Sequence, residues 1–399
     1  MEFLTVPVPE TANTILAAAI EGFSRENGQP VNQSHVDWDA AWRELVNVGI
    51  YRKGPDIAEI GSTWLESLVA MQSLYPFSPQ DITRVGGQEI FFPSAWQNVV
   101  LPSQKEIYGV PFRADVRVVF YWKDMFETVS IDPTEAFSST ENMQVAFTKL
   151  QQAGISPWVA PTNNTHNTVY MIASWLWGAG GDFLSPDGKR TQFGLPAAQR
   201  GIQAYFDLLR FMPQQTFPLT DNDVWEIFSE RKAAAVVAGP WLVNNFLMKK
   251  DGEELISRLG TVLLPGPSFV GGSTLVIWKH GKHWPEAVEF IKRLTSVEFQ
   301  SEYCQVSGLL PVRQDLWTEH FIGNHEYLSV FNKAMRAGRG LPPIALWGMI
   351  EDRLSATFAA IWRELYSLDM SQKSQDKLDK IVTKHLEILA ARLDVTLSE

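Results

Sequence analysis

The chain has 399 residues, of which 45% are hydrophobic and 20% charged, and its formal net charge is −11. This length exceeds the size at which one hydrophobic core stops growing, so we expect two lobes. The sequence has no apolar run of the roughly 18 residues that a membrane span needs and no basic cluster for a phosphate backbone, which argues against a nucleic-acid partner.

The first 110 residues alternate strand-like and helix-like segments, a pattern typical of a largely parallel α/β sheet. Strands are expected at 3–8 and 55–60. An amphipathic helix is expected from Thr11. Its inward face should carry Ile15, Ala19 and Phe23.

Gly61 to Trp64 follow the second strand and predict a tight turn before a helix that starts at Leu65. Open α/β sheets bind ligands at such strand ends. Ser62 and Trp64 are therefore candidates for ligand contact.

The stretch from Tyr108 to Asp124 predicts a hinge strand between the lobes. Apolar and other side chains alternate from Val116 to Tyr121 at the two-residue period of a strand. Pro111 fixes its own backbone angle and lacks an N–H donor, so we expect a Pro/Gly corner before this run. The second lobe should begin near Asp115.

The second lobe should continue the α/β alternation. We expect helices from about Glu141 and over 198–209, a hairpin-like loop around Ser185 to Gly188, and a helix, a turn and a strand over 225–237.

The composition changes after Leu264, where 265–273 reads as a flexible connector before a strand at 274–278. Helices should follow at 287–295 and 297–306. The break at 307–313 is a plausible third crossing, and the tail should be helical.

Cys304 is the single cysteine of the sequence, which excludes an internal disulfide and a multi-cysteine zinc site. We expect it to pack in the core. Met1 to Val6 begin on a strand-like run without the features of a secretory signal. The residues alone therefore fit either a cytoplasmic protein or one whose signal was removed.

Six separated segments, in this order, resemble bacterial extracellular solute-binding proteins of the sugar-transport type. They are Gly54-Pro-Asp-Ile-Ala-Glu-Ile60, the hinge stretch, Trp177-Gly-Ala-Gly-Gly-Asp182, Ala238-Gly-Pro-Trp241, Gly271-Gly-Ser273 and Gly308-Leu-Leu-Pro-Val-Arg313. Each segment alone is weak, but the ordered set spans most of the chain.

The resemblance implies a two-lobe α/β fold of the periplasmic-binding-protein type (type II), with a ligand cleft between the lobes and several hinge crossings. Lobe 1 would comprise 1–111 and 269–313, and lobe 2 would comprise 115–265 and 314–399. The hinges would lie near 110–118, 264–273 and 307–315.

The same resemblance implies a protein that is not an enzyme. It would be a monomer without cofactor or metal that captures a mono- or oligosaccharide and delivers it to the membrane permease of an ABC transporter. It would act in the periplasm or on the outer face of the membrane, its export signal having been removed.

Flat aromatic rings suit the apolar face of a sugar, and the chain has 15 tryptophans. Those beside loops or Gly/Pro turns are candidates: Trp38, Trp64, Trp175, Trp177, Trp241 and Trp347. Core or lobe-interface packing is the alternative for each. Trp241, after Gly239-Pro240, and Trp38, beside two aspartates, are the stronger ones, whereas Trp278 is assigned to the core.

Polar candidates lie at predicted strand ends, hinges and glycine-flanked loops: Glu10, Asp39, Ser62, Asp115, Arg117, Asp182 and Arg313. Asp115 and Arg117 could instead form a structural ion pair, and Asp182 could cap a turn. Gly180, Gly271 and Gly272 would allow close backbone approach to a ligand, although turn geometry explains them equally well.

Signals for other chemistries are weak. His280 and His283 have no evident third ligand, and the glycine clusters lack a phosphate-loop ending. Two carboxylates among Glu10, Asp39, Asp115 and Asp182 could serve a glycosidase. A polyol or a glycosylated osmolyte remains an alternative ligand.

Overall fold

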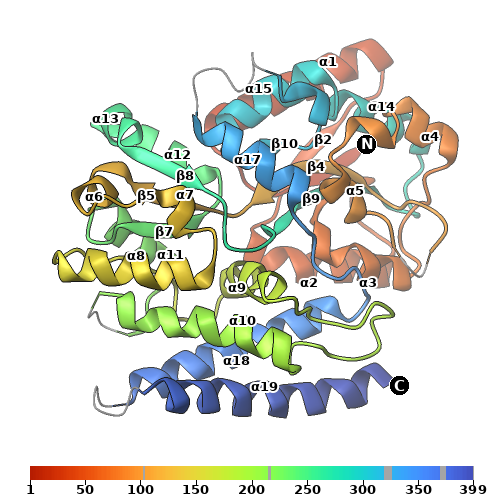
Figure 1. The fold of residues 1–399 in the computed structure, drawn as a ribbon. Coiled ribbons are helices and arrows are strands. Elements are labelled where there is room, and N and C mark those ends of the chain that lie inside the picture. The colour runs from red at the N-terminus through yellow and green to blue at the C-terminus, as the bar shows by residue number, and fades with distance from the viewer. Residues whose placement is uncertain (102–103, 214–216, 319–325, 369–373, 399) are drawn as a thin grey trace.

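Two β-sheets organise the molecule (Figure 1). The computed structural model describes residues 1–101, 104–213, 217–318, 326–368 and 374–398. In spatial order, the six-stranded sheet contains β10 (Leu310–Pro311), β4 (Val110–Val116), β9 (Val270–Ile277), β3 (Ile57–Gly61), β1 (Glu2–Thr5) and β2 (Asn32–His35). The four-stranded sheet contains β6 (Trp158–Val159), β7 (Ala235–Ala238), β5 (Val118–Trp122) and β8 (Leu259–Val262).

Helices surround each sheet. On the side of the six-stranded sheet these are α1 (Glu10–Asn27), α2 (Trp38–Tyr51), η1 (Ser62–Trp64), α3 (Leu65–Ala70), α4 (Pro79–Arg84), η2 (Gln88–Ile90), α5 (Pro93–Gln97), α14 (Trp284–Leu294), α15 (Val297–Ser307) and η4 (Gln314–Leu316). On the side of the four-stranded sheet they are α6 (Lys123–Thr128), α7 (Pro133–Ala136), α8 (Thr140–Gln152), α9 (His166–Gly178), α10 (Pro196–Asp207), η3 (Leu208–Phe211), α11 (Asp221–Ser229), α12 (Trp241–Leu247), α13 (Gly252–Ser257), α18 (Trp347–Tyr366) and α19 (Gln375–Ser398). α17 (Glu326–Ala337) touches strands of both sheets.

The first sheet is mixed rather than largely parallel. β1 pairs in parallel with β2 and β3, as the alternating pattern predicted. β9 is antiparallel to both β3 and β4, and β10 is antiparallel to β4. The chain therefore leaves this sheet after β4 and returns to its centre with β9.

The first crossing consists of one residue. β4 ends at Val116 and β5 begins at Val118, so Arg117 alone separates the two sheets. The corner predicted at Pro111 is wrong, since Pro111 lies inside β4, where the register with β9 shifts between Pro111 and Arg113. A bulge accommodates a residue that cannot donate to the ladder.

The return crossing is shorter than expected. β9 begins at Val270, so Gly271 and Gly272 belong to a strand and not to a flexible connector. Gly272 has a φ of +129°, and a Cβ there would overlap the carbonyl oxygen of Arg113 on β4. Glycine is needed here because two strand backbones approach closely.

Most of the predicted core is confirmed. Trp278 and Cys304 are buried, and burial raises the pKa of the Cys304 thiol to about 12. The buried face of α1 differs slightly from the prediction: Ala12, Leu16 and Phe23 are buried, whereas Ile15 and Ala19 are only half-buried.

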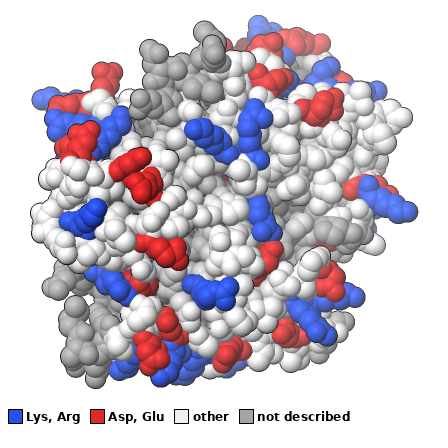
Figure 2. Space-filling view, viewed as in Figure 1, with Lys and Arg blue, Asp and Glu red and all other residues white. Residues whose placement is uncertain are grey.

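Two features of the helices and of the visible surface bear on membrane spanning and charge. Within the described residues, none of the helices combines the length and apolar character required to cross a membrane. On the face shown in Figure 2, acidic and basic side chains are interspersed.

Candidate functional site

Strand ends of the six-stranded sheet meet at one edge, beside the first crossing. The carboxyl ends of β1, β2 and β3 lie together because these strands are parallel. β3 and β4 also run in the same direction, since β9 is antiparallel to both; Gly61 pairs with Ser273 and Asp115 with Gly271. Seven predicted residues follow or occupy these ends: Glu10, Trp38, Ser62, Trp64, Asp115, Gly271 and Gly272.

The second sheet presents a matching edge. β5 leaves the crossing at Val118, which pairs with Ala238 at the end of antiparallel β7. Gly239, Pro240 and Trp241 follow directly. β6 runs parallel to β7, and the chain then passes to the N-terminal end of α9. The two sheet edges and the crossing therefore converge.

Arg117 forms the centre of a polar cluster at this point. Its Nη1 donates to Oδ1 of Asp115 at 2.6 Å, and its Nη2 donates to Oδ1 of Asn167, on α9, at 2.8 Å. Its buried Nε has no hydrogen-bond partner among the described residues. Burial raises the pKa of Asp115, and the charge of Arg117 opposes this shift.

The predicted ion pair is therefore present, but it leaves room for a ligand contact. The side chain of Asp115 keeps 22% of its surface exposed, whereas that of Arg117 keeps 5%. A hydroxyl group in the cleft could donate to the exposed carboxylate while the buried guanidinium holds it in place.

Tyr170 extends the cluster along α9. Its ring stacks on Phe269, with centroids 4.4 Å apart and planes 5° apart, and the Arg117 guanidinium lies 5.9 Å from its centroid. Burial raises the pKa of Tyr170 well above its ordinary value, and the neighbouring carboxyl of Glu351 raises it further. The phenol therefore stays protonated at neutral pH and can donate a hydrogen bond.

His166 joins α9 to two carboxylates at the start of α18. Its Nε2 lies 2.8 Å from Oδ1 of Asp352, and its Nδ1 lies 3.9 Å from Oε1 of Glu351. Burial raises the pKa of Glu351, while His166 acts in the opposite direction. The C-terminal helices thus contribute directly to the polar groups around Tyr170.

The Trp241 ring lies next to Arg117, and the Trp225 ring packs against Trp241. Trp225 and Trp241 meet edge to face with centroids 4.4 Å apart, and the Arg117 guanidinium lies 5.9 Å from the Trp241 centroid. A Cβ on Gly239 would overlap Nε1 of Trp241 and lie 2.7 Å from Oδ1 of Asp115. Gly239 therefore lets Trp241 approach the ion pair.

The two lobes touch near these groups. Asn244, on α12, donates to the carbonyl of Val306 at 3.4 Å, and the hydroxyl of Ser67 donates to the carbonyl of Ala345 at 2.6 Å. The first bond joins a helix beside the four-stranded sheet to a helix beside the six-stranded sheet, and the second joins α3 to the segment before α18, so the two halves of the molecule are in contact in this structure.

Trp38 and Trp64 lie at the strand-end edge and face a third tryptophan, Trp42. The ring of Trp64 lies 5.5 Å from that of Trp38 and 5.8 Å from that of Trp42. Trp38 and Trp42 are one helical turn apart on α2, which places both on the same face.

Three predicted tryptophans, Trp175, Trp177 and Trp347, are buried. Trp175 packs edge to face against Trp158 and Tyr205, and Trp347 packs against Phe183. α9 continues to Gly178, so the sequence around Trp175 forms helix where a loop was expected.

Trp177, Asp182 and Arg339 form a structural unit. Asp182 accepts from Nε1 of Trp177 at 3.2 Å and from Arg339 at 2.7 Å, and the Arg339 guanidinium lies 4.9 Å from the Trp177 centroid. Asp182 also accepts from the backbone N–H of Phe183 at 2.9 Å, so it does cap the turn that it enters. Ligand contact by Asp182 stays a prediction. Gly180 has a positive φ of +79°, which turn geometry explains.

A further predicted residue, Arg313, does not join the cluster. Arg313 donates to Asp315 and to the carbonyl of Thr295, away from the edge formed by β3 and β4. Asp39 lies in α2, but its side chain is outside the described part of the structure.

Sequence reasoning missed Trp42, Asn167, Tyr170, Trp225 and Glu351. The sequence could have shown that Trp42 lies beside Trp38, because the two residues are four positions apart in a helix. The other four come from α9, α11 and α18 and are brought together only by tertiary packing.

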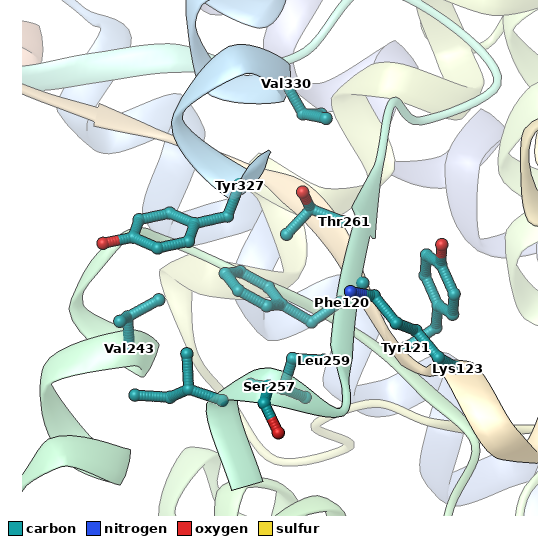
Figure 3. Close-up of a pocket in the computed structure, with 11 residues that line it drawn as sticks. Phe120, Tyr121, Lys123, Val243, Ser257, Leu259, Thr261, Tyr327 and Val330 are labelled. Atoms are coloured by element: carbon teal, nitrogen blue, oxygen red, sulfur yellow. The ribbon is translucent and has the colours of Figure 1, made fainter. Parts of the chain in front are cut away.

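Two pockets lie away from the polar cluster around Arg117. One pocket of about 300 Å³ lies between β5, β8, α12, α13 and α17, with Phe120, Val243, Leu259 and Val330 around it (Figure 3). Another of about 380 Å³ lies among α8, α9, α10 and α19. Among the described residues no group of three or more His, Cys, Asp or Glu side chains could hold a metal ion.

Comparison with known proteins gives consistent matches. A family model described as bacterial extracellular solute-binding protein matches residues 18–322. A putative binding protein of Brucella abortus is 22% identical over 357 residues, which is 86% of this chain and 83% of that protein. The maltodextrin-binding protein MdxE of Bacillus subtilis is 22% identical over 297 residues, which is 70% of this chain and 64% of that protein.

The fold has close structural counterparts as well. The sugar-binding protein MalE from the phytopathogen Xanthomonas citri superposes with a TM-score of 0.81 at 21% sequence identity, covering 100% of both chains. This likeness confirms the two-lobe α/β fold expected from the sequence.

Proposed function

Because the chain belongs to the family of bacterial extracellular solute-binding proteins, we propose that it captures a mono- or oligosaccharide between its two lobes. The family is one of binding proteins, so the protein holds its ligand without converting it. This favours binding over the glycosidase alternative.

The observation that carries the proposal is the polar cluster around Arg117 with the ring of Trp241 beside it. A sugar presents hydroxyl groups around an apolar C–H face, so its site needs fixed polar groups and flat aromatic surfaces. Asp115, Asn167 and Tyr170 supply the polar groups, and Trp241 supplies a half-buried ring.

Lobe closure links binding to transport. A ligand that contacts both lobes has a higher affinity for the closed form and shifts the population toward it. The closed form would be the one that the membrane subunits of an ABC permease recognise. The lobes would divide as predicted from the sequence, at 1–111 with 269–313 and at 115–265 with 314–399.

The family is extracellular by description, which supports a place outside the cell membrane. We propose the periplasm or the outer face of the membrane as the site of action. A monomer suffices for this role, since both lobes of the site come from one chain.

Thermal unfolding against a panel of mono-, di- and trisaccharides tests the proposal. A ligand that binds only the folded chain at 100 times its dissociation constant adds roughly 2.7 kcal/mol to the free energy of unfolding. We expect one structural class of sugar to raise the melting temperature. A response to polyols or glycosylated osmolytes alone would contradict the sugar assignment.

A further inference from the structure

Two segments that are distant in sequence meet at one end of the six-stranded sheet. The end of β9 pairs with the start of β3, because the two strands are antiparallel. Residues 49–56 and 278–285 therefore lie side by side. The backbone N–H of Trp278 donates to the carbonyl of Asp56 at 2.9 Å, which holds the two segments together.

These two segments are basic, although the protein as a whole is acidic. The chain has 34 Lys and Arg against 45 Asp and Glu, whereas the two segments contain four cations and one carboxylate, Asp56. The four cations are Arg52, Lys53, Lys279 and Lys282. All four are exposed, and none of them forms an ion pair with another described residue. Neither segment alone is a basic cluster, so the fold is what creates this concentration of positive charge.

The nearby carboxylates do not neutralise the cations. Asp56 uses Oδ2 to accept from the backbone N–H of Glu2 at 2.8 Å, and Glu2 accepts from the side chain of Asn32 at 2.8 Å. Glu286 follows the second segment, one turn into α14. Four cations therefore face two bonded carboxylates and one at the border.

Large apolar side chains accompany the cations. Ile50 and Tyr51 end α2 with 61% and 71% of their surface exposed, and Trp284 begins α14 with 37% exposed. The ring of Trp284 lies 4.6 Å from that of Tyr75, whose N–H donates to the carbonyl of Ile277 at the end of β9. These side chains therefore border the same end of the sheet as the cations.

The basic end lies opposite the proposed sugar site. On β9, Gly271 pairs with Asp115, and Ile277 lies six positions further along the strand. At about 3.3 Å per residue, the two ends of the strand are about 20 Å apart. A partner bound at the basic end thus leaves the polar cluster around Arg117 uncovered.

The mixture of charge and aromatic rings indicates the kind of partner. At physiological ionic strength the Debye length is about 8 Å, so a surface that approaches this end interacts mainly with the four cations and only weakly with carboxylates elsewhere. Lysine and arginine attract anionic lipid headgroups, and tyrosine and tryptophan rings prefer the headgroup level of a bilayer. An anionic bilayer surface matches both properties.

We propose that the basic end, formed by Arg52, Lys53, Lys279 and Lys282 with the rings of Tyr51 and Trp284 beside them, binds the anionic headgroups of a phospholipid bilayer. The cations pair with headgroup phosphates, and the rings enter the headgroup layer. This inference goes beyond sugar capture, and its surface shares no residue with the sugar site.

Co-sedimentation of the full chain with lipid vesicles tests the inference. The chain should bind vesicles that contain phosphatidylglycerol and should not bind vesicles of phosphatidylcholine alone. Added salt should weaken the binding, because it screens the charges. Each cation near an anionic surface strengthens binding about fivefold, so Lys53→Gln combined with Lys282→Gln should lower the partition coefficient about 25-fold.

Lys149→Gln combined with Lys384→Gln is the matched control, because it removes the same charge from exposed positions on α8 and α19. It should keep at least half of the wild-type binding, and both double variants should keep the wild-type melting temperature. Equal binding to the two kinds of vesicle, or equal losses in the two double variants, would overturn the inference. Binding to polyglutamate without binding to anionic vesicles would also overturn it, since the partner would then be an acidic protein surface.

Discussion

Arg117 connects three parts of the chain that are distant in sequence. It pairs with Asp115 on β4, bonds to Asn167 on α9 and lies over the ring of Trp241 on α12. A buried guanidinium with fixed partners cannot rearrange easily, because breaking either bond leaves a buried charge without compensation. The crossing residue therefore holds the polar cluster in one geometry.

Trp241→Ala tests the aromatic part of the site. We expect sugar binding to weaken by roughly 1–3 kcal/mol, the loss typical of a stacked, desolvated ring. Calorimetric titration with the sugar found in the thermal panel measures the change. Trp284→Ala serves as the control, and unchanged affinity of the Trp241 variant would remove this residue from the site.

Glu351 should make stability depend on pH. Burial raises its pKa in the folded state above the unfolded value of about 4.3. The folded chain therefore binds this proton more tightly, and the free energy of unfolding falls as pH rises from about 4.3 through the raised pKa. Glu351→Gln should be more stable than wild type at pH 7, with a difference that shrinks toward pH 4.

Urea unfolding from pH 4 to pH 8 measures this difference. Exposed Glu387 on α19 provides the control, and Glu387→Gln should leave the pH profile unchanged. If the difference in unfolding free energy between Glu351→Gln and wild type is the same at every pH, folding does not raise the pKa of Glu351.

At the residue scale, the sequence predicted the hinge pair and the strand-end tryptophans. Asp115, Arg117 and Trp241 were detectable because strand periodicity and glycine-proline turns mark them in the chain. Tyr170 and Glu351 were not, since each sits in a helix whose local pattern only indicates packing. Trp175 was misplaced because α9 continues to Gly178 and buries this ring, whereas the nearby glycines suggested a loop.

At the scale of elements, β9 determines how the first sheet is assembled. It inserts between β3 and β4 and so returns the chain to the centre of the sheet. Gly272 makes this insertion possible, because its φ of +129° and missing side chain leave room for the Arg113 carbonyl. The sequence showed glycines here but could not distinguish a flexible connector from a tightly packed strand.

Gly272→Ala should therefore be strongly destabilising. The added methyl group overlaps a backbone oxygen that cannot move without breaking the β4–β9 ladder, and the positive φ adds strain. Gly348→Ala on α18 is the contrasting variant, since no atom lies within 4 Å of the new methyl group. Thermal unfolding should show a large loss for the first and none for the second; equal effects would contradict this account.

At the scale of the whole molecule, the two lobes are held together by the chain crossings and by hydrogen bonds between them. Ser67 to Ala345 and Asn244 to Val306 are two such bonds. The resemblance predicted two lobes and several crossings, and the fold confirms that architecture. Composition could not place the lobes relative to each other, because their contacts join residues far apart in sequence.

Ser67→Ala should weaken sugar binding because it destabilises the form in which the two lobes are in contact. Loss of one hydrogen bond between the lobes destabilises closure by about 0.5–1.5 kcal/mol, and apparent affinity falls accordingly. Ser78→Ala is the control, since Ser78 caps α4 within one lobe. It should lower the melting temperature without changing sugar affinity; equal affinity losses in both variants would contradict a role for Ser67 in closure.

Native mass spectrometry of the full chain mixed with the saccharide panel tests the central claim most directly. The account predicts a complex of one chain with one saccharide whose released ligand has an unchanged mass. A complete lack of complexes would contradict sugar capture, and a shortened saccharide would show that the protein is an enzyme.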